Sequence, residues 1–267
     1  MATGLKTRTG GHVLYLYGIT REGQGTPASV TGVDGSAAVE AMPCAGLVCW
    51  VSRVGKAEFA ENLAGNMENL EWLAEVSVRH QQAVAAIARA HDILPARFGT
   101  VFRSPASLRA DVEERKRLLV RDLKRVGGCE EWGVKIFHLA PQPQMAVTAE
   151  SGRDYLRAKA AALRAQAPRG ADGEIEPLLQ ALKAVAAETA SGGGAVSRGQ
   201  RGLQWQGALL VKRSQATKLQ QVLRRFSREW EGTRRIEVSG PWPPYSFVSR
   251  AQKRKTGGQR GSQPSGG

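Results

Sequence analysis

The sequence predicts an α+β protein made of two packed units, and three observations indicate this. The chain has 267 residues, 42% of them hydrophobic, which is enough to bury a core but more than one small module needs. Segments rich in β-branched and aromatic residues interleave with segments whose apolar residues recur at helical spacing. A Pro/Gln break at residues 140–144 separates the halves. We expect each half to form a small sheet with helices on one face.

The first half opens with strands and then turns to helices. Residues 13–19 and 47–54 are rich in Val, Leu, Tyr and Trp, which predicts two strands. Residues 56–64 predict a short helix, and the apolar stripe of residues 69–91 predicts a longer one. The apolar run 93–102 contains a proline, which favours an edge strand because proline cannot donate a ladder hydrogen bond.

The next helix carries the strongest local signals. Ser104 is suited to the N-cap position and Pro105 to the first helical position. The apolar stripe then consists of Leu108, Val112, Leu119, Leu123 and Val126. The pair Gly127 and Gly128 predicts the end of this helix. Residues 132–139 predict a strand that closes the first half.

The second half alternates in the same way. The expected elements are helices at 153–166 and 174–190, a strand at 203–211, a helix capped by Ser214 and a strand at 235–238. The aromatic residues Tyr15, Tyr17, Trp50 and Trp132 fall at strand positions that face a core.

The chain is basic, with 38 Lys and Arg against 24 Asp and Glu and a net charge of +14. The head, 1–11, and the tail, 249–267, contain no acidic residue, and we expect both to be disordered. They leave +7 of the charge on the body. A basic nucleic-acid-binding module is therefore the alternative function, and its patch would be Arg224, Arg225, Arg228, Arg234 and Arg235. A solvated helix face explains most of these arginines, and no RNA-binding signature is present.

The pattern of reactive residues does not indicate an enzyme. Cys44, Cys49 and Cys129 are odd in number and lack CxxC spacing, so we expect buried thiols in a reducing cytoplasm and no disulfide. His80 and His91 lie near one helical face, but no further ligands stand at metal-site spacing. The sequence shows no nucleophile elbow and no phosphate-binding loop, and we expect neither a signal peptide nor a membrane span. We expect no catalytic residue, cofactor or metal.

Two phrases have no simple packing explanation. Arg97 interrupts the apolar run 94–102, and such an arginine is usually paired or bound. Arg97 could pair with Glu71 or Glu75 of this chain or with an acidic residue of a partner. We favour the internal pairing, because we expect Arg97 to be partly buried. The stiff, Pro-rich residues 240–245 carry two large aromatic rings and suit either a lid over the C-terminal core or a docking segment. The candidate partner-binding residues are Arg97, Phe98, Trp242, Pro243, Pro244 and Tyr245.

Five phrases in a fixed order carry a family resemblance. They are Tyr15-Leu16-Tyr17-Gly18-Ile19, Val33-Asp34-Gly35, Leu94 to Phe102, Glu131-Trp132-Gly133-Val134-Lys135 and Gly240 to Val248. Together they resemble the signatures of the gas vesicle protein GvpF/GvpL family over residues 12–248. The resemblance implies an N-terminal ferredoxin-like α+β domain, 12–140, and a smaller C-terminal α+β domain, 141–248.

The resemblance also implies a function. Members of this family are non-enzymatic accessory proteins of gas vesicles, the hollow protein shells that give prokaryotic cells buoyancy. It implies that this chain binds the main shell protein and other vesicle proteins during nucleation and growth, as an assembly factor or minor structural protein. The expected location is the cytoplasm and the gas vesicle, with no membrane and no specific nucleic acid as partner. A helper of this kind would shield the strand edges or apolar face of an aggregation-prone shell subunit.

Overall fold

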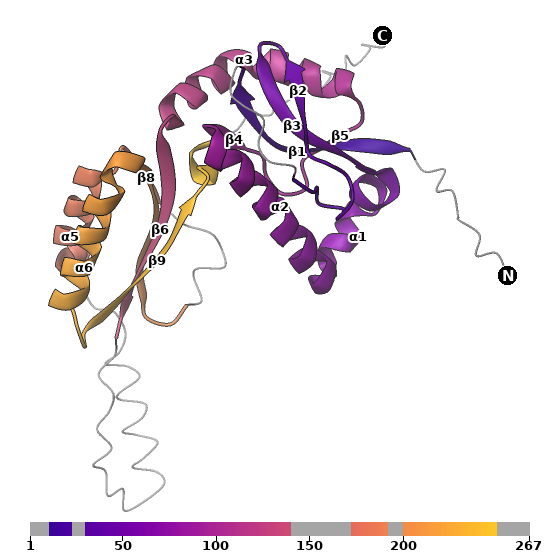
Figure 1. The fold of residues 1–267 in the computed structure, drawn as a ribbon. Coiled ribbons are helices and arrows are strands. Elements are labelled where there is room, and N and C mark those ends of the chain that lie inside the picture. The colour runs from indigo at the N-terminus through magenta and orange to yellow at the C-terminus, as the bar shows by residue number, and fades with distance from the viewer. Residues whose placement is uncertain (1–10, 23–29, 140–171, 192–199, 250–267) are drawn as a thin grey trace, which may run out of the picture.

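The structure, a computed structural model, describes residues 11–22, 30–139, 172–191 and 200–249. Two β-sheets with their helices form two units (Figure 1), and the α+β class predicted from the sequence is confirmed. The expected disordered head and the helix at 153–166 lie outside the described residues, as does the basic tail beyond Ser249.

The first sheet is antiparallel throughout. Its strands are β1 (His12–Arg21), β2 (Glu40–Cys44), β3 (Leu47–Gly55), β4 (Ile93–Pro95) and β5 (Val101–Phe102). Their order is β2-β3-β1-β4, with β5 also beside β1. The proline-containing strand β4 lies at an end of this order, as predicted. Gly18 allows the close approach of β1 and β4, because a Cβ there would lie 2.8 Å from the carbonyl oxygen of Leu94.

Helices cover both faces of the first sheet, which corrects the expectation of helices on one face. They are a π-helical turn (Ala57–Glu61), α1 (Leu63–Glu68), α2 (Leu70–Ala90) and α3 (Pro105–Val126). Buried residues of α2 pack with Tyr15 and Tyr17, and those of α3 pack with Leu14 and Leu16 on the opposite face of β1. The sequence already contains the reason, since β1 is apolar at consecutive positions and all eight inner residues are buried.

Local signals explain where the long helices begin. The Asn69 side chain caps α2 by accepting from the backbone N–H groups of Glu71 and Trp72. Ser104 and Ser107 form a reciprocal capping box at α3, and Pro105 takes the first helical position as predicted. All five residues of the predicted α3 stripe are buried.

The second sheet has the ferredoxin-like topology. Its strands are β6 (Cys129–His138), β7 (Glu188–Ser191), β8 (Leu203–Lys212) and β9 (Arg234–Trp242), and its helices are α5 (Asp172–Val185) and α6 (Ala216–Glu229). The chain order βαββαβ and the sheet order β7-β8-β6-β9 define the split βαβ arrangement. The assignment of this topology to residues 12–140 is therefore wrong. The first unit lacks it because β1, β2 and β3 follow one another with no helix between them among the described residues, whereas the split βαβ arrangement requires a helical crossover after its first strand.

Two further boundaries differ from the sequence prediction. The sheets divide at Gly127 and Gly128, because β6 pairs with β8 and β9 although it precedes the predicted boundary at 140. Ser214 does not cap α6; it lies in the 3-10 turn Arg213–Gln215, and Gln215 takes the N-cap position without a side-chain hydrogen bond.

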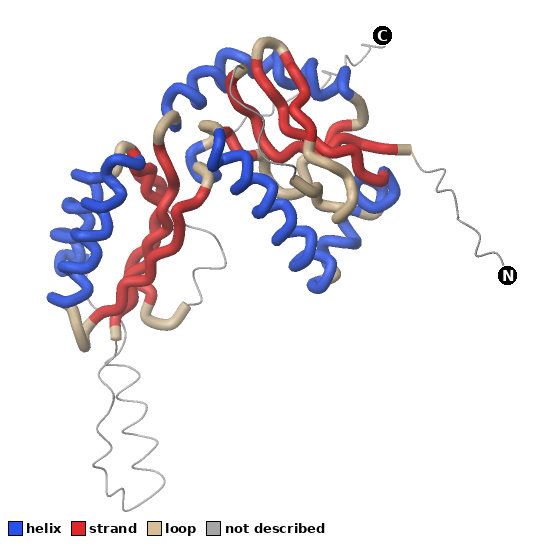
Figure 2. The backbone as a smooth tube through the Cα atoms, viewed as in Figure 1, coloured by secondary structure: helices blue, strands red, loops and turns tan. Residues whose placement is uncertain are grey.

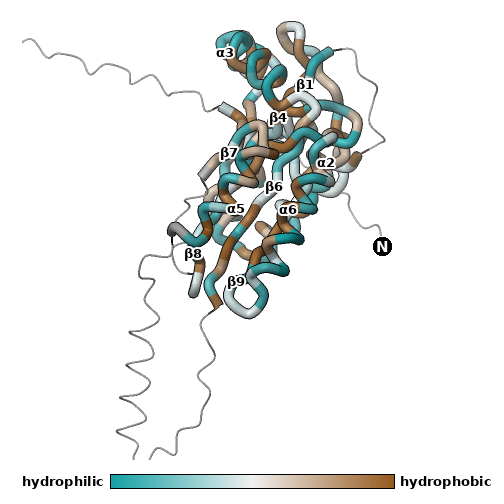
Figure 3. Tube along the Cα trace, turned by 90° about the vertical axis from the view of Figure 1, so that its left-hand side faces the viewer, coloured by the Kyte–Doolittle hydropathy of each residue, from teal (hydrophilic) through white to brown (hydrophobic). Residues whose placement is uncertain are grey.

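The two units share apolar packing. Helices α5 and α6 cover the face of the second sheet that points away from the first unit, as the helix and strand colours of Figure 2 show. They lie side by side over that sheet in the hydropathy-coloured view (Figure 3), with their own core around Ile136, Leu178 and Leu219. On the other face, Leu210 of β8 joins the cluster that contains Leu123 of α3. One apolar core therefore continues from the first unit into the second.

Candidate functional site

The chain segment after β9 returns to the first unit and crosses the junction between the two. We call residues 243–249 the C-terminal strap; it includes the 3-10 turn Tyr245–Phe247. Phe247 is buried in the apolar cluster shared by β1, α3 and β8. Arg125 of α3 donates to the carbonyl oxygen of Phe247. The strap therefore closes the junction between the units rather than the core of the C-terminal unit.

His80 of α2 joins the strap to the first sheet. Its Nδ1 lies 3.1 Å from the hydroxyl oxygen of Tyr15, and its Nε2 lies 3.3 Å from that of Tyr245. Burial lowers the pKa of His80 to about 4, against a smaller opposing effect of a hydrogen bond with the Ala96 backbone. Since a neutral imidazole offers one donor and one acceptor nitrogen, it can bridge two hydroxyl groups.

Aromatic rings surround this bridge. The ring centroid of His80 lies 5.8 Å from that of Phe98, edge to face, and 6.0 Å from that of Tyr17, stacked. Gly99, next to Phe98, donates its backbone N–H to the Tyr15 hydroxyl over 2.9 Å. Burial raises the pKa of Tyr15 and Tyr245 well above the usual range, so both hydroxyls keep their protons.

The remaining signature phrases connect to the same junction. The Tyr17 hydroxyl accepts the backbone N–H of Val33 over 2.9 Å. The buried carboxylate of Glu131 accepts both the backbone N–H and the hydroxyl of Ser246, at 2.8 and 2.7 Å. Gly240 of β9 has φ +121°, and a Cβ there would lie 2.8 Å from the Glu131 carbonyl oxygen, so this position, where the pairing of β9 with β6 shifts register, requires glycine. All five phrases thus contribute to one internal contact network.

A second carboxylate fixes the end of the strap. The side chain of Asp122 in α3 is buried and accepts the backbone N–H of Ser249 over 2.8 Å. Burial alone would raise the pKa of Asp122. Hydrogen bonds with Ser249 and the charge of Arg125 outweigh this effect and hold the pKa below its ordinary value. The carboxylate is therefore charged at neutral pH and holds the strap on α3.

The structure separates the candidate partner-binding residues into internal and exposed groups. Phe98, Pro243 and Tyr245 are half-buried and Pro244 is buried, all of them near the junction. Trp242 is 44% exposed, and the side chain of Arg97 is exposed as well. The partner-binding role of these residues stays a prediction.

The expectation of a partly buried, paired Arg97 is wrong. The chain turns outward here, with the Arg97 carbonyl oxygen accepting the backbone N–H of Thr100 over 3.2 Å and its hydroxyl over 2.7 Å. Gly99 has φ +75°, a left-handed conformation that suits this turn. Glu75 instead forms an ion pair with Arg79 on the same helix.

A cavity of about 340 Å³ lies beside the strap, between the two units. Trp242, Pro243 and Pro244 line one part of it, and Arg89 and Asp92 line another. The aromatic side chain of Trp242 is thus exposed next to a hollow at the junction. Arg213 closes onto Asp92 in an ion pair of 2.8 Å at this cavity.

Other reactive residues pack into the cores. The predicted core positions of Tyr15, Tyr17, Trp50 and Trp132 are all buried. All three cysteines are buried and free, and burial raises the pKa of the Cys49 and Cys129 thiols. Among the described residues, no cluster of three or more His, Cys, Asp and Glu side chains can hold a metal ion. Within the same residues, no helix has both the length and the apolar character to cross a bilayer.

Fold and junction together define a class of protein: two α+β units, the second ferredoxin-like, fixed by a C-terminal strap. The family described as Gas vesicle synthesis protein GvpL/GvpF matches residues 13–249, and the chain belongs to this family. It is 30% identical over 258 residues to Gas vesicle protein L of Streptomyces sp. (strain CB03234), covering 90% of this chain and 94% of that protein. The chain therefore has a role in gas vesicles.

Two solved structures share the fold. The crystal structure of GvpF from Anabaena sp. PCC7120 has a TM-score of 0.64 at 17% identity, over 90% of this chain and 98% of that one. GvpF from Microcystis aeruginosa has a TM-score of 0.65 at 18% identity, over 89% and 99%. At this identity the likeness shows the fold.

Sequence reasoning missed the polar residues that hold the strap, namely His80, Asp122, Arg125 and Glu131. Their local signal was weak but present. His80 and Asp122 occupy buried positions of amphipathic helices, where an ionisable side chain requires a partner. Glu131 falls within a signature phrase, but it follows Glu130, and two adjacent acids are typical of a solvated face.

Proposed function

We propose that this chain acts in gas vesicle nucleation and assembly by binding the main shell protein and other vesicle proteins in the cytoplasm, without catalysing a reaction. The observation that carries the proposal is the structural role of the residues in the signature phrases. Their aromatic and polar residues hold the two units in one arrangement, around His80 and Glu131, instead of forming a reactive centre. A fixed arrangement of two units suits a protein that positions others.

The exposed residues of the signature phrases form the proposed binding surface. The rings of Phe98 and Tyr245 both contact the ring of His80. In the sequence, Arg97 is next to Phe98 and Trp242 is close to Tyr245. Exposed tryptophan and arginine are the side chains that most often dominate the energy of protein interfaces. The burial of the three cysteines, with raised thiol pKa values for Cys49 and Cys129, supports the absence of a nucleophilic role.

Co-purification tests the proposal. The affinity-tagged chain, co-expressed with the shell protein, is expected to retain it, and the double variant Arg97→Ala/Trp242→Ala is expected to retain much less. Leu70→Ala is the matched control, because Leu70 is a large apolar residue that is 79% exposed elsewhere, on α2. Failure of the unaltered chain to retain the shell protein would contradict the proposed function. Equal retention by the double variant would contradict the proposed surface.

A further inference from the structure

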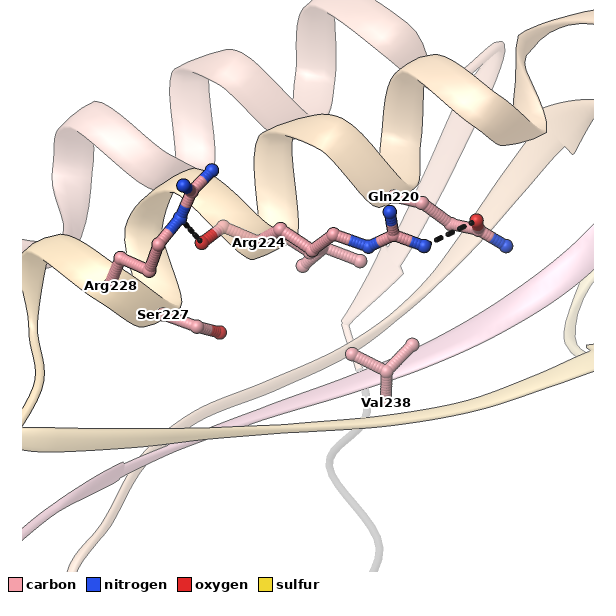
Figure 4. A pocket seen from close by; sticks show the side chains of 6 residues that line it. Gln220, Arg224, Ser227, Arg228 and Val238 are labelled. Carbon is pink, nitrogen blue, oxygen red and sulfur yellow. Dashed lines mark hydrogen bonds between the residues drawn. The ribbon is translucent and has the colours of Figure 1, made fainter.

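A second surface lies in the C-terminal unit, between α6 and β9. Figure 4 shows the groove there, with β9 running along the helix. Its volume is about 640 Å³, and its lining consists of Gln220, Leu223, Arg224, Ser227 and Arg228 of α6 and Val238 of β9. Strand β9 is the last in its sheet order, so one of its edges has no partner strand within the described residues.

The groove has an apolar floor beside this open strand edge. Leu223 is buried at its base, and Val238 is 43% exposed on β9. An edge strand presents unpaired backbone N–H and C=O groups, and an extended peptide that pairs with them adds a strand to the sheet. An apolar side chain of such a peptide would cover Val238. The backbone and the floor therefore both suit an extended segment.

The rim of the groove carries positive charge that the described residues do not neutralise. Arg224 donates to the side-chain oxygen of Gln220, and Arg228 donates to the backbone carbonyl of Arg224, each over 3.4 Å. Both acceptors are uncharged. The groove lining contains no acidic residue, and the neighbouring Glu229 is paired with Arg225.

The other arginines of the basic patch are already paired. Arg225 forms its ion pair with Glu229, Arg234 forms one with Glu174, and Arg235 lies 3.0 Å from Glu237. The uncompensated charge of the patch is therefore concentrated on the two arginines that line the groove, which points to an acidic ligand.

We propose that this groove binds an extended, acidic segment of a partner protein as an added strand along β9. Arg224 and Arg228 are four residues apart, which corresponds to about 6 Å along a helix. Alternate residues of a strand lie about 6.6–6.8 Å apart and point to the same face. Two carboxylates at alternate positions of the segment thus match the two guanidinium groups, and an apolar side chain on the same face of the segment can cover Val238.

Charge and lining select this occupant over two others. A second copy of this chain, paired edge to edge through β9, would bring its own Arg224 and Arg228 toward those of the first and place like charges together. Single-stranded nucleic acid usually binds where aromatic rings are exposed for base stacking, and no aromatic side chain lines the groove. Neither Arg97 nor Trp242 lines the groove, so the inference goes beyond the proposed function and is tested separately from it.

Fluorescence anisotropy with the full chain tests this. The probe is a fluorescein-labelled nine-residue peptide with glutamate at two alternate positions, valine at the next alternate position and threonine elsewhere. A second peptide of the same composition has its two glutamates adjacent, which sends one carboxylate to each face of the strand. We expect the alternate peptide to bind more tightly, and the variant Arg224→Glu/Arg228→Glu to weaken its binding by at least about tenfold.

The control variant is matched in charge. Lys116→Glu with Lys218→Glu reverses two exposed cations outside the groove and changes the net charge equally. It is expected to keep the affinity of the unaltered chain. Equal binding of both peptides, or equal loss in both variants, would overturn the proposal. The proposal would also be overturned if a fluorescein-labelled oligouridine bound more tightly than the alternate peptide at about 150 mM salt and only the Arg224→Glu/Arg228→Glu variant lost this binding. The groove would then be a nucleic-acid surface.

Discussion

Protonation of His80 provides the sharpest test of the junction. The pKa of its imidazole is about 4 in the folded chain, compared with an ordinary value of 6.5 in the unfolded chain. A depressed pKa contributes stability that is present above 6.5 and is lost as the pH falls toward 4. Between pH 7.5 and pH 5 this one group should remove about 2 kcal/mol from the free energy of unfolding.

Urea unfolding at the two pH values measures this loss. The chain is compared with its His80→Gln variant, because glutamine is polar but does not titrate. The variant is less stable at pH 7.5, since it loses the bridge between Tyr15 and Tyr245. Its deficit should shrink by about 2 kcal/mol at pH 5, because only the unaltered chain is destabilised by His80. Other titrating groups are common to both proteins and cancel.

The matched control is His12→Gln, because His12 is exposed at the start of β1. This variant is expected to keep the free energy of unfolding of the unaltered chain at pH 7.5, because the side chain that it replaces is exposed. A deficit of His80→Gln that does not change between pH 7.5 and pH 5 would refute the argument that a neutral, buried imidazole holds the strap.

Three other changes test the strap. Phe247→Ala should lower the free energy of unfolding by about 3–5 kcal/mol, because it empties a buried site in the shared core; a loss below about 1 kcal/mol in urea unfolding would show that the strap is not packed there. Ser246→Ala should cost about 1–3 kcal/mol, since the buried Glu131 loses its hydroxyl donor, and an unchanged urea midpoint would argue against that contact. Removal of residues 250–267 should leave the melting temperature unchanged, because it keeps the whole strap through Ser249, which Asp122 holds; a marked fall would show that the tail packs.

Local signals were sufficient for part of the fold. The start of α3 was predictable because the capping box and Pro105 act within a few residues of the chain. Strand β2 was not, since Pro43 lies within it and argues against a strand; the position is tolerated because β2 is at the end of its sheet. Strand β7, from Glu188, looked like the end of a helix and is a strand through its pairing with β8.

The junction could not be predicted from local patterns. His80 and Tyr245 are 165 positions apart, and nothing in the spacing of either segment indicates that they meet. The family resemblance identified the phrases, but it did not predict that they contact one another. The position of Arg97 could not be predicted either. Its side chain is exposed and not in the interior as expected, because the chain turns at Gly99.

Complementation of a deletion strain tests the central claim, the role in gas vesicle assembly, most directly. The strain must lack this chain and every other GvpF or GvpL copy, and vesicles are counted and measured by electron microscopy. We expect absent or malformed vesicles in the deletion strain and normal vesicles once the unaltered chain is restored. Normal vesicles in the deletion strain would contradict it.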